Sequence, residues 1–343
     1  MSFIAHRKEL EADPFLDIAV LAGGDSSERE VSLASGRRVA WALEQKGHGV
    51  AVFDPCDGDL FGINWNQFDA CFVALHGGAG EDGRVQLQLE ELAVPYTGSG
   101  PVVSRLAISK SATKDRLQQC AVPTPAAYSF RRDDDPAQIA AKVRRLGFPV
   151  VVKPDGQGSS LGVTVAADEP QLQQAIETAG QFESYLLAEK RIVGREFTVA
   201  VVDRQPLPAL EVSHDQSTFD YDGKTGSGNV EYRFSNDWAA ETAQQLAVRA
   251  ADAVGSRSLI RVDLIIDRGG QPWVLEVNTV PGMTEHSLAP MAAREAGFEM
   301  SDFCDRLVRL CLPEEEYQYA GRQLGQTKTG EAPTWSQTIR AAS

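Results

Sequence analysis

The sequence predicts a protein of mixed α/β and α+β class with three domains, the first of them built around a parallel sheet. Its 343 residues are enough for about two or three domains. With 43% hydrophobic and 24% charged residues, the composition is that of a globular protein, which excludes a disordered or fibrous chain. Short apolar segments alternate with amphipathic ones along most of the chain, which indicates strands and helices in one fold.

The expected N-terminal α/β domain covers residues 1–100. Residues 16–21 form a short apolar strand that runs into a glycine turn, and residues 28–46 then show the apolar spacing of a helix. Residues 49–53 and 70–75 follow as strands that end in polar or glycine-rich loops. This order begins a βαβ unit, and such parallel sheets carry binding loops at the carboxyl ends of their strands.

The expected central domain covers residues 101–193 and alternates helices with strands. One apolar strand delivers Lys153 to a glycine-rich loop. The expected helices are residues 109–119, 136–146 and 171–179, and the expected strands are residues 149–152, 161–165 and 184–189.

The expected C-terminal domain covers residues 194–312. The polar residues 313–343 after it are predicted to form a flexible tail. The expected strands are residues 196–202, 208–212, 259–266 and 272–278, and the expected helices are residues 237–254 and 300–312.

Charge and cysteine content exclude several functional classes. The net charge of −15 argues against nucleic acid as a partner, although a local cluster of lysines and backbone N–H groups can still hold a small anion. Five scattered cysteines without a Cys-x-x-Cys pair indicate neither a disulfide framework nor a zinc site. Because no run approaches 18 apolar residues, we expect no membrane span and a cytoplasmic protein.

Four polar residues are predicted to share one face of a β-hairpin. A two-residue turn at residues 269–270 would place Asp263 opposite Glu276 and Arg261 opposite Asn278. Two carboxylates facing each other across a sheet repel, so a cation is expected between them. Oxygen ligands of this kind favour Mg²⁺. The alternative is a solvated polar face that Arg261 bridges.

Three glycine-rich loops are candidate binding loops, each with a simpler alternative. The loop at residues 153–162 can bring backbone N–H groups to phosphate oxygens, but it is no Walker loop and an ordinary hairpin turn fits as well. At residues 23–30, Ser27 and Glu30 fit a helix capping box, whereas Glu28 could instead bind an ammonium group. The loop beginning at His76 has more glycines than one turn needs, although His76 alone could be a structural hydrogen-bonding residue.

Six segments in a fixed order form a recognisable set of motifs. They lie at residues 23–32, 74–83, 95–99, 153–162, 261–263 and 276–288. With these motifs the chain resembles the D-alanine-D-alanine ligase family of the ATP-grasp superfamily, over about residues 18 to 312. The first and last motifs separate this family from other ATP-grasp enzymes.

The resemblance implies a three-domain ATP-grasp architecture, with an N-terminal substrate-binding domain and ATP held between the central and C-terminal domains. The implied cofactors are two Mg²⁺ ions, for which Mn²⁺ can substitute, and ATP is the implied co-substrate. The residues that match metal ligands are Asp263, Glu276 and Asn278, which are three of the four hairpin residues. The residues that match ATP-binding positions are Lys110, Lys153, Glu189, Lys190, Ile192, Glu196 and Lys224.

The resemblance also implies catalytic and substrate-binding positions. Glu28 matches the residue that holds the ammonium group of the first D-alanine. Arg261 and the backbone N–H of Gly282 match groups that stabilise a tetrahedral intermediate, and Ser287 and Leu288 match the site of the second carboxylate. The catalytic set implied is Glu28, Ser159, Arg261 and Gly282, and the substrate-binding set is His76, Ser287 and Leu288.

The implied reaction joins two D-alanine molecules for peptidoglycan precursor synthesis. The first carboxylate accepts the γ-phosphoryl group of ATP, and the amine of the second D-alanine then displaces phosphate. Thr225 stands where the family's lid loop typically has a tyrosine, so D-lactate or D-serine stays an alternative second substrate. A nucleotide-binding paralogue without turnover is a third interpretation. The sequence does not decide the oligomeric state, and a homodimer is left open.

Overall fold

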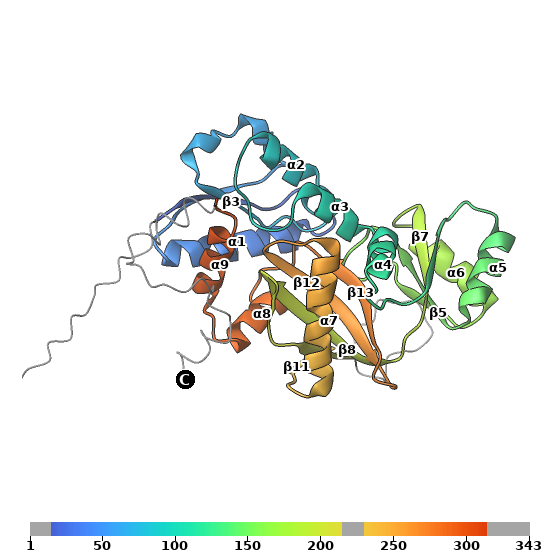
Figure 1. Ribbon diagram of the computed structural model, residues 1–343. Helices are drawn as coiled ribbons and strands as arrows, with labels where there is room; N and C mark the ends of the chain where they lie inside the picture. Colours follow the sequence, from blue (N-terminus) through green and yellow to red (C-terminus); the bar gives the residue numbers. More distant parts are fainter. Residues whose placement is uncertain (1–14, 215–229, 314–343) are drawn as a thin grey trace, which may run out of the picture.

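The computed structural model describes residues 15–214 and 230–313, with three sheets that follow one another along the chain (Figure 1). The N-terminal sheet is parallel with strand order β2-β1-β3, which confirms the predicted parallel-sheet class. Its strands are β1 (Asp17–Leu21), β2 (Gly49–Phe53) and β3 (Ala70–Val73), its helices are α1 (Arg29–Gln45) and α2 (Arg84–Glu91), and its short 3-10 turns are η1 (Leu60–Gly62), η2 (Trp65–Gln67) and η3 (Gly78–Gly80).

The central sheet is antiparallel with strand order β4-β7-β5-β6. Two helices pack on it, and each begins at an aspartate that accepts an N-terminal N–H group, with proline in the first turn. The expected strand at residues 161–165 is wrong in its bounds, because positive φ angles of 55° at Ser160 and 71° at Gly162 keep the chain in a turn. The elements are β4 (Ala127–Arg131), α5 (Pro136–Leu146), β5 (Val150–Pro154), β6 (Thr164–Ala166), α6 (Glu169–Ala179) and β7 (Tyr185–Lys190).

The C-terminal sheet is also antiparallel, in the order β11-β10-β8-β12-β13, with β9 paired to β8. The long helix α7 (Trp238–Val254) covers one face, where its alanines pack on alternate apolar residues of the strands. The strands are β8 (Gly194–Val202), β9 (Gln205–Pro206), β10 (Leu210–His214), β11 (Val230–Phe234), β12 (Leu259–Asp267) and β13 (Pro272–Asn278).

Four further helices join the sheets to one another. Helices α8 (Leu288–Glu295) and α9 (Met300–Arg309) pack in the same core as α1 and β1. Helix α3 (Pro101–Ile108) and helix α4 (Lys110–Gln119) place Ala107 and Leu117 in the core under α7. In Figure 1, α4 lies between α7 and the central sheet. The domain boundaries at residues 100 and 193 therefore stay a prediction, because α3 and α4 pack on the C-terminal side.

The hairpin of β12 and β13 has the predicted pairing but not the predicted turn. Asp263 lies opposite Glu276 and Arg261 opposite Asn278, as expected. The two-residue turn at residues 269–270 is wrong, because Ile266 pairs with Pro272 and the connection is longer. A shift of register between Asp263 and the next residue of β12, a β-bulge, restores the predicted pairing at the polar end.

Other features of the described chain bear on the expectations from sequence. All five cysteines are free thiols. No described helix has the length and apolar character that crossing a bilayer requires. The predicted flexible tail lies outside the described residues, except for Pro313.

Candidate active site

The polar face of the β12–β13 hairpin is half-buried and already charged. Arg261 donates to both carboxylate oxygens of Asp263, at 3.0 Å from Nε and 2.8 Å from Nη2. Thr198 of β8 donates its hydroxyl to the same carboxylate at 2.5 Å. Burial works to raise the pKa of Asp263, but the charge and hydrogen bonds of Arg261 outweigh it, so that this pKa is lowered. The Arg261 bridge that the sequence left as an alternative is thus present.

Two further oxygen-bearing side chains lie on this face, and each has a contact within the chain. Glu276 Oε2 lies 3.7 Å from Nζ of Lys110, and Asn278 accepts a hydrogen bond from the backbone of Val280 at 2.8 Å. Within residues 15–214 and 230–313, no three His, Cys, Asp or Glu side chains form a metal cluster. The oxygen set is therefore two carboxylates and one amide, which is a small protein contribution of the kind that Mg²⁺ accepts beside phosphate and water.

Two buried lysines, one from α4 and one from the central sheet, lie next to the glycine-rich loop after β5. Lys110 is the first residue of α4, whose N-terminus is capped by Ser109, and its ammonium donates to the carbonyl of Gln157 at 2.6 Å. Lys153 lies near the end of β5 and donates to Glu189 of β7 at 2.6 Å. Both lysines are buried, so each brings positive charge into a site of restricted solvent access.

The glycine-rich loop after β5 is fastened to α4 at one end. Asp155 accepts hydrogen bonds from the Ser109 hydroxyl at 2.6 Å and from the Ser111 N–H at 2.8 Å. Further along, Ser159 has a positive φ of 50° and donates a short hydrogen bond to Glu28. The predicted site residues Glu28 and Ser159 are thus brought together from loops that follow strands of two different sheets.

Glu28 is at the start of α1 and has no side-chain capping role. The predicted capping box of Ser27 and Glu30 is wrong, because Glu28 itself is the N-cap residue and makes no side-chain cap hydrogen bond. Its N–H instead donates to the hydroxyl of Ser26, at 3.1 Å. The Glu28 carboxylate is therefore turned toward the loop of Ser159, where an ammonium group could reach it.

His76 acts as a buried connector between the N-terminal sheet and the loop after β13. Its Nδ1 lies 3.0 Å from the carbonyl of Val280, and its Nε2 lies 2.8 Å from the hydroxyl of Ser35. A carbonyl can only accept, so Nδ1 carries the proton and Nε2 accepts from Ser35. Burial lowers the pKa of His76, which favours this neutral form. Both ring nitrogens are occupied, as the structural alternative for His76 requires.

Glu81 is a buried acidic residue of this region that the sequence patterns did not single out. It is 7% exposed and follows η3 in the glycine-rich loop after β3. Burial, and then the charge of Glu28, raise its pKa to about 7, while the Gly77 N–H and the charge of Arg261 oppose part of the change. The only sequence signal was its place in a loop with four glycines.

The residues implied for the second substrate lie at the start of α8. Ser287 is the N-cap residue, and its hydroxyl accepts from the N–H of Thr284 at 3.0 Å. A Cβ at Gly282 would come within 2.6 Å of that hydroxyl, so a larger residue there would displace the Ser287 side chain. Leu288 is the first residue of α8.

The remaining implied residues are only partly brought to this region. Lys190 ends β7, Ile192 is half-buried in the turn after it, and Glu196 lies on β8 opposite Val212. Lys224 lies outside the described residues, as does Thr225.

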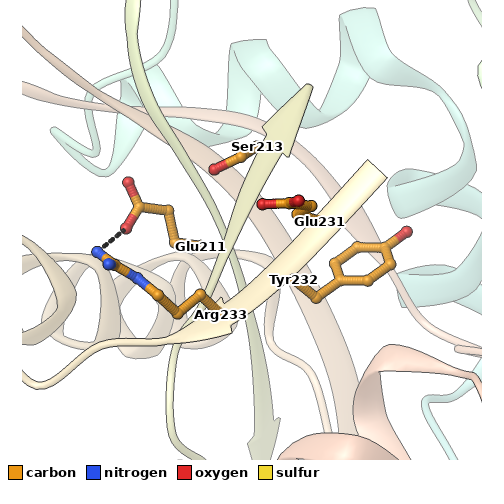
Figure 2. Close-up of a pocket in the computed structure, with 5 residues that line it drawn as sticks. All are labelled: Glu211, Ser213, Glu231, Tyr232 and Arg233. Atoms are coloured by element: carbon orange, nitrogen blue, oxygen red, sulfur yellow. Dashed lines mark hydrogen bonds and ion pairs between the residues drawn. The ribbon is translucent and has the colours of Figure 1, made fainter. Parts of the chain in front are cut away.

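A hollow beside β10 and β11 is a different feature and contains no predicted site residue (Figure 2). It is lined by Glu211, Ser213, Glu231, Tyr232 and Arg233. Glu211 already accepts two hydrogen bonds of 2.7 Å from Arg195. Because Glu211 pairs with Phe197, which packs under α7, its side chain lies on the opposite face of the sheet from Thr198 and Asp263.

Comparison with known proteins identifies many similar chains. A family model described as D-ala D-ala ligase C-terminus matches residues 117–309. D-alanine-D-alanine ligase from Hydrogenovibrio crunogenus is 42% identical over 299 residues, covering 86% of this chain and 95% of that protein. The same enzyme from Marinobacter nauticus is 41% identical over 300 residues, covering 87% of this chain and 91% of that protein.

Solved structures show the same similarity in three dimensions. D-alanine-D-alanine ligase from Bacillus anthracis superposes with a TM-score of 0.78 at 30% identity, covering 90% of this chain and 99% of that one. The same ligase complexed with ATP gives a TM-score of 0.75 at 29% identity, with the same coverage. VanG D-Ala:D-Ser ligase from Enterococcus faecalis also gives 0.78, at 25% identity, covering 87% of this chain and all of that one.

Proposed function

The chain belongs to the D-alanine-D-alanine ligase family, and from this premise we propose that it joins two D-alanine molecules with the hydrolysis of ATP to ADP and phosphate. The observation that carries the proposal is the meeting of groups from all three sheets. Ser159, in the loop after β5 of the central sheet, bonds Glu28, which lies between β1 of the N-terminal sheet and α1, and Lys110 of α4 approaches Glu276 of β13 in the C-terminal sheet. A reaction that consumes ATP and joins two amino acids needs such a meeting point, because its rate depends on holding three reactants in the correct relative orientation.

In the proposed first step, the carboxylate of one D-alanine attacks the γ-phosphorus of ATP. ADP leaves, and a D-alanyl phosphate remains. Glu28 binds the ammonium group of this D-alanine, since its carboxylate faces the loop of Ser159 rather than its own helix. The buried lysines Lys110 and Lys153 are proposed to balance phosphate charge, because such a transfer depends on electrostatics more than on a protein nucleophile.

In the proposed second step, the amine of the other D-alanine attacks the acyl carbon and phosphate leaves. The developing oxyanion is stabilised by Arg261 and by the backbone N–H of Gly282. Burial works against the charge on Arg261, but Asp263 and then Glu276 raise its pKa, so it stays cationic throughout. Ser287 at the N-terminus of α8 is proposed to hold the carboxylate of this substrate, where the helix dipole favours an anion.

Two Mg²⁺ ions, or Mn²⁺ in their place, are proposed as cofactors. The residues that would hold them are Asp263, Glu276 and Asn278, and their all-oxygen donor set fits a hard cation. When bound, such ions neutralise phosphate charge during the transfer. Arg261 now bonds both oxygens of Asp263, so cation binding requires this carboxylate to be shared.

The second candidate has the same chemistry with another acceptor. It is favoured by the similarity to VanG D-Ala:D-Ser ligase and by Thr225 in place of the family's usual tyrosine. In that case D-serine or D-lactate would replace the second D-alanine. A cytoplasmic site of action and a homodimeric assembly also remain predictions.

The decisive assay measures ADP release by the purified chain with ATP and Mg²⁺, first without and then with D-alanine. D-Serine and D-lactate are added in separate reactions, and the products are identified by mass spectrometry. We expect ADP release to rise with D-alanine and the dipeptide to be the main product. ADP release that does not rise with D-alanine would refute the ligase, and the absence of any ADP release would favour the paralogue without turnover. A product that contains D-serine or D-lactate would select the second candidate.

A further inference from the structure

A buried ion cluster behind the candidate phosphate site contains a lysine to which the mechanism assigns no role. The Glu189 carboxylate is 3% exposed and lies between two ammonium groups. Lys153 is 2.6 Å from one of its oxygens, and Lys114 of α4 is 2.7 Å from the other. One carboxylate is therefore shared by two cations, and the cluster carries a net positive charge.

The two lysines are held very differently. Lys114 is 2% exposed, and its ammonium also donates to the hydroxyl of Thr124 at 2.8 Å and to the carbonyl of Pro125 at 3.3 Å. Thr124 in turn donates to the carbonyl of Val274 in β13, at 2.8 Å. Lys114 thus has two fixed hydrogen-bond acceptors in the loop before β4, besides its ion pair with Glu189.

Lys153 lies where the chain leaves the sheet. It is in the penultimate position of β5, directly before the glycine-rich loop whose Ser159 reaches Glu28. Its side chain can turn from Glu189 toward a ligand by rotation about its own bonds, because it has a flexible four-carbon stem. Lys114 has no comparable freedom, since its ammonium group is fixed by hydrogen bonds to Thr124 and Pro125.

We propose that Lys114 is a positioning residue for ATP, the permanent counter-charge that keeps Glu189 neutralised when Lys153 turns to a nucleotide phosphate. The proposal rests on the proposed function, which makes Lys153 a phosphate ligand. A buried carboxylate that loses its only cation is strongly destabilised, so without Lys114 the carboxylate would retain Lys153. Burial works to raise the pKa of Glu189, but Lys153 and then Lys114 lower it, which agrees with a carboxylate that stays ionised.

The test is equilibrium binding of a non-hydrolysable ATP analogue with Mg²⁺, measured by isothermal titration calorimetry. In Lys114→Met we expect the Kd to rise at least about tenfold, since a retained Lys153 must break a buried ion pair before it can bind phosphate. In the ligase assay, KM for ATP should rise by a similar factor while KM for D-alanine changes less than about twofold. An unchanged Kd in a folded Lys114→Met protein overturns the proposal.

A double-mutant cycle separates this role from simple packing. In the Glu189→Gln background no carboxylate can retain Lys153, so adding Lys114→Met should change the Kd by less than about twofold. If Lys114 acts only by filling space, its removal weakens binding equally in both backgrounds, and the proposal fails.

Thr124→Val provides a second variant in case Lys114→Met does not fold. It keeps the charge of Lys114 but removes one of its anchors, and we expect about a threefold rise in Kd, whereas no change contradicts the proposal. Binding by the wild-type protein distinguishes a failure of the proposed function from a failure of the role proposed for Lys114. If wild type fails to bind the analogue, the proposed function is wrong, and if wild type binds and the variants match it, only the role of Lys114 is wrong.

Discussion

Replacing Glu81 by glutamine should remove a large part of the pH dependence of stability. Burial and the charge of Glu28 raise the pKa of Glu81 from 4.5 to about 7. A carboxyl whose pKa is higher in the folded state stabilises fully below pH 4.5, and this stability is lost as the pH rises through 7. At 1.36 kcal/mol per tenfold change in proton affinity, the whole effect is about 3 kcal/mol. Between pH 6 and pH 8 it amounts to about 1.4 kcal/mol.

Urea unfolding at pH 6 and pH 8, followed by the fluorescence of Trp65 and the other tryptophans, measures this difference. Trp65 is buried in the core of the N-terminal sheet, near the loop that carries Glu81. Wild type should lose about 1.4 kcal/mol more than Glu81→Gln between the two pH values. Glu91→Gln, at an exposed position in α2, is the matched control and should behave like wild type. Equal losses in wild type and Glu81→Gln would refute the assignment of a raised pKa to Glu81.

Three further substitutions test other parts of the structure. Glu276→Gln should lower kcat at least about a hundredfold in the ADP-release assay, because it removes a proposed ligand at the site of charge transfer, and near-normal turnover would contradict that role. Ser159→Ala should raise KM for D-alanine about tenfold, since Glu28 loses a charge-assisted hydrogen bond. An unchanged KM would show that the hydrogen bond from Ser159 to Glu28 does not contribute to D-alanine binding. His48→Ala should reduce the free energy of unfolding by about 2 kcal/mol in urea, because the buried ring contacts Asp305 at 2.8 Å and accepts from the Leu16 N–H at 3.1 Å. A loss below about 0.5 kcal/mol would show these contacts to be dispensable.

The hairpin shows how far local sequence rules reach. Alternation correctly placed Asp263 opposite Glu276, but the turn was expected to contain two residues. The Asp267 side chain accepts from the N–H groups of Gly269 and Gln271, both at 2.9 Å, and so stabilises a longer connection. The bulge then compensates for the extra residue. The longer turn and the bulge shift the pairing in opposite directions. Neither can be predicted by counting residues, because the turn depends on the Asp267 side chain and the bulge on the local pairing of the strands.

The same limit applies to charged residues at the boundary between sheets. Residues such as Lys153 were predictable, because an apolar strand followed by glycines marks a strand end wherever it occurs. Lys114 was not, since α4 has the polar sequence of a surface helix and only its contacts with α7, β4 and β13 bury that lysine. Burial of a lysine is tolerated when a carboxylate and hydrogen-bond acceptors converge on it, and those partners come from β7 and the loop before β4. A helix shared between two sheets can thus carry charged residues on its buried face, where Lys110 and Lys114 lie with Leu117.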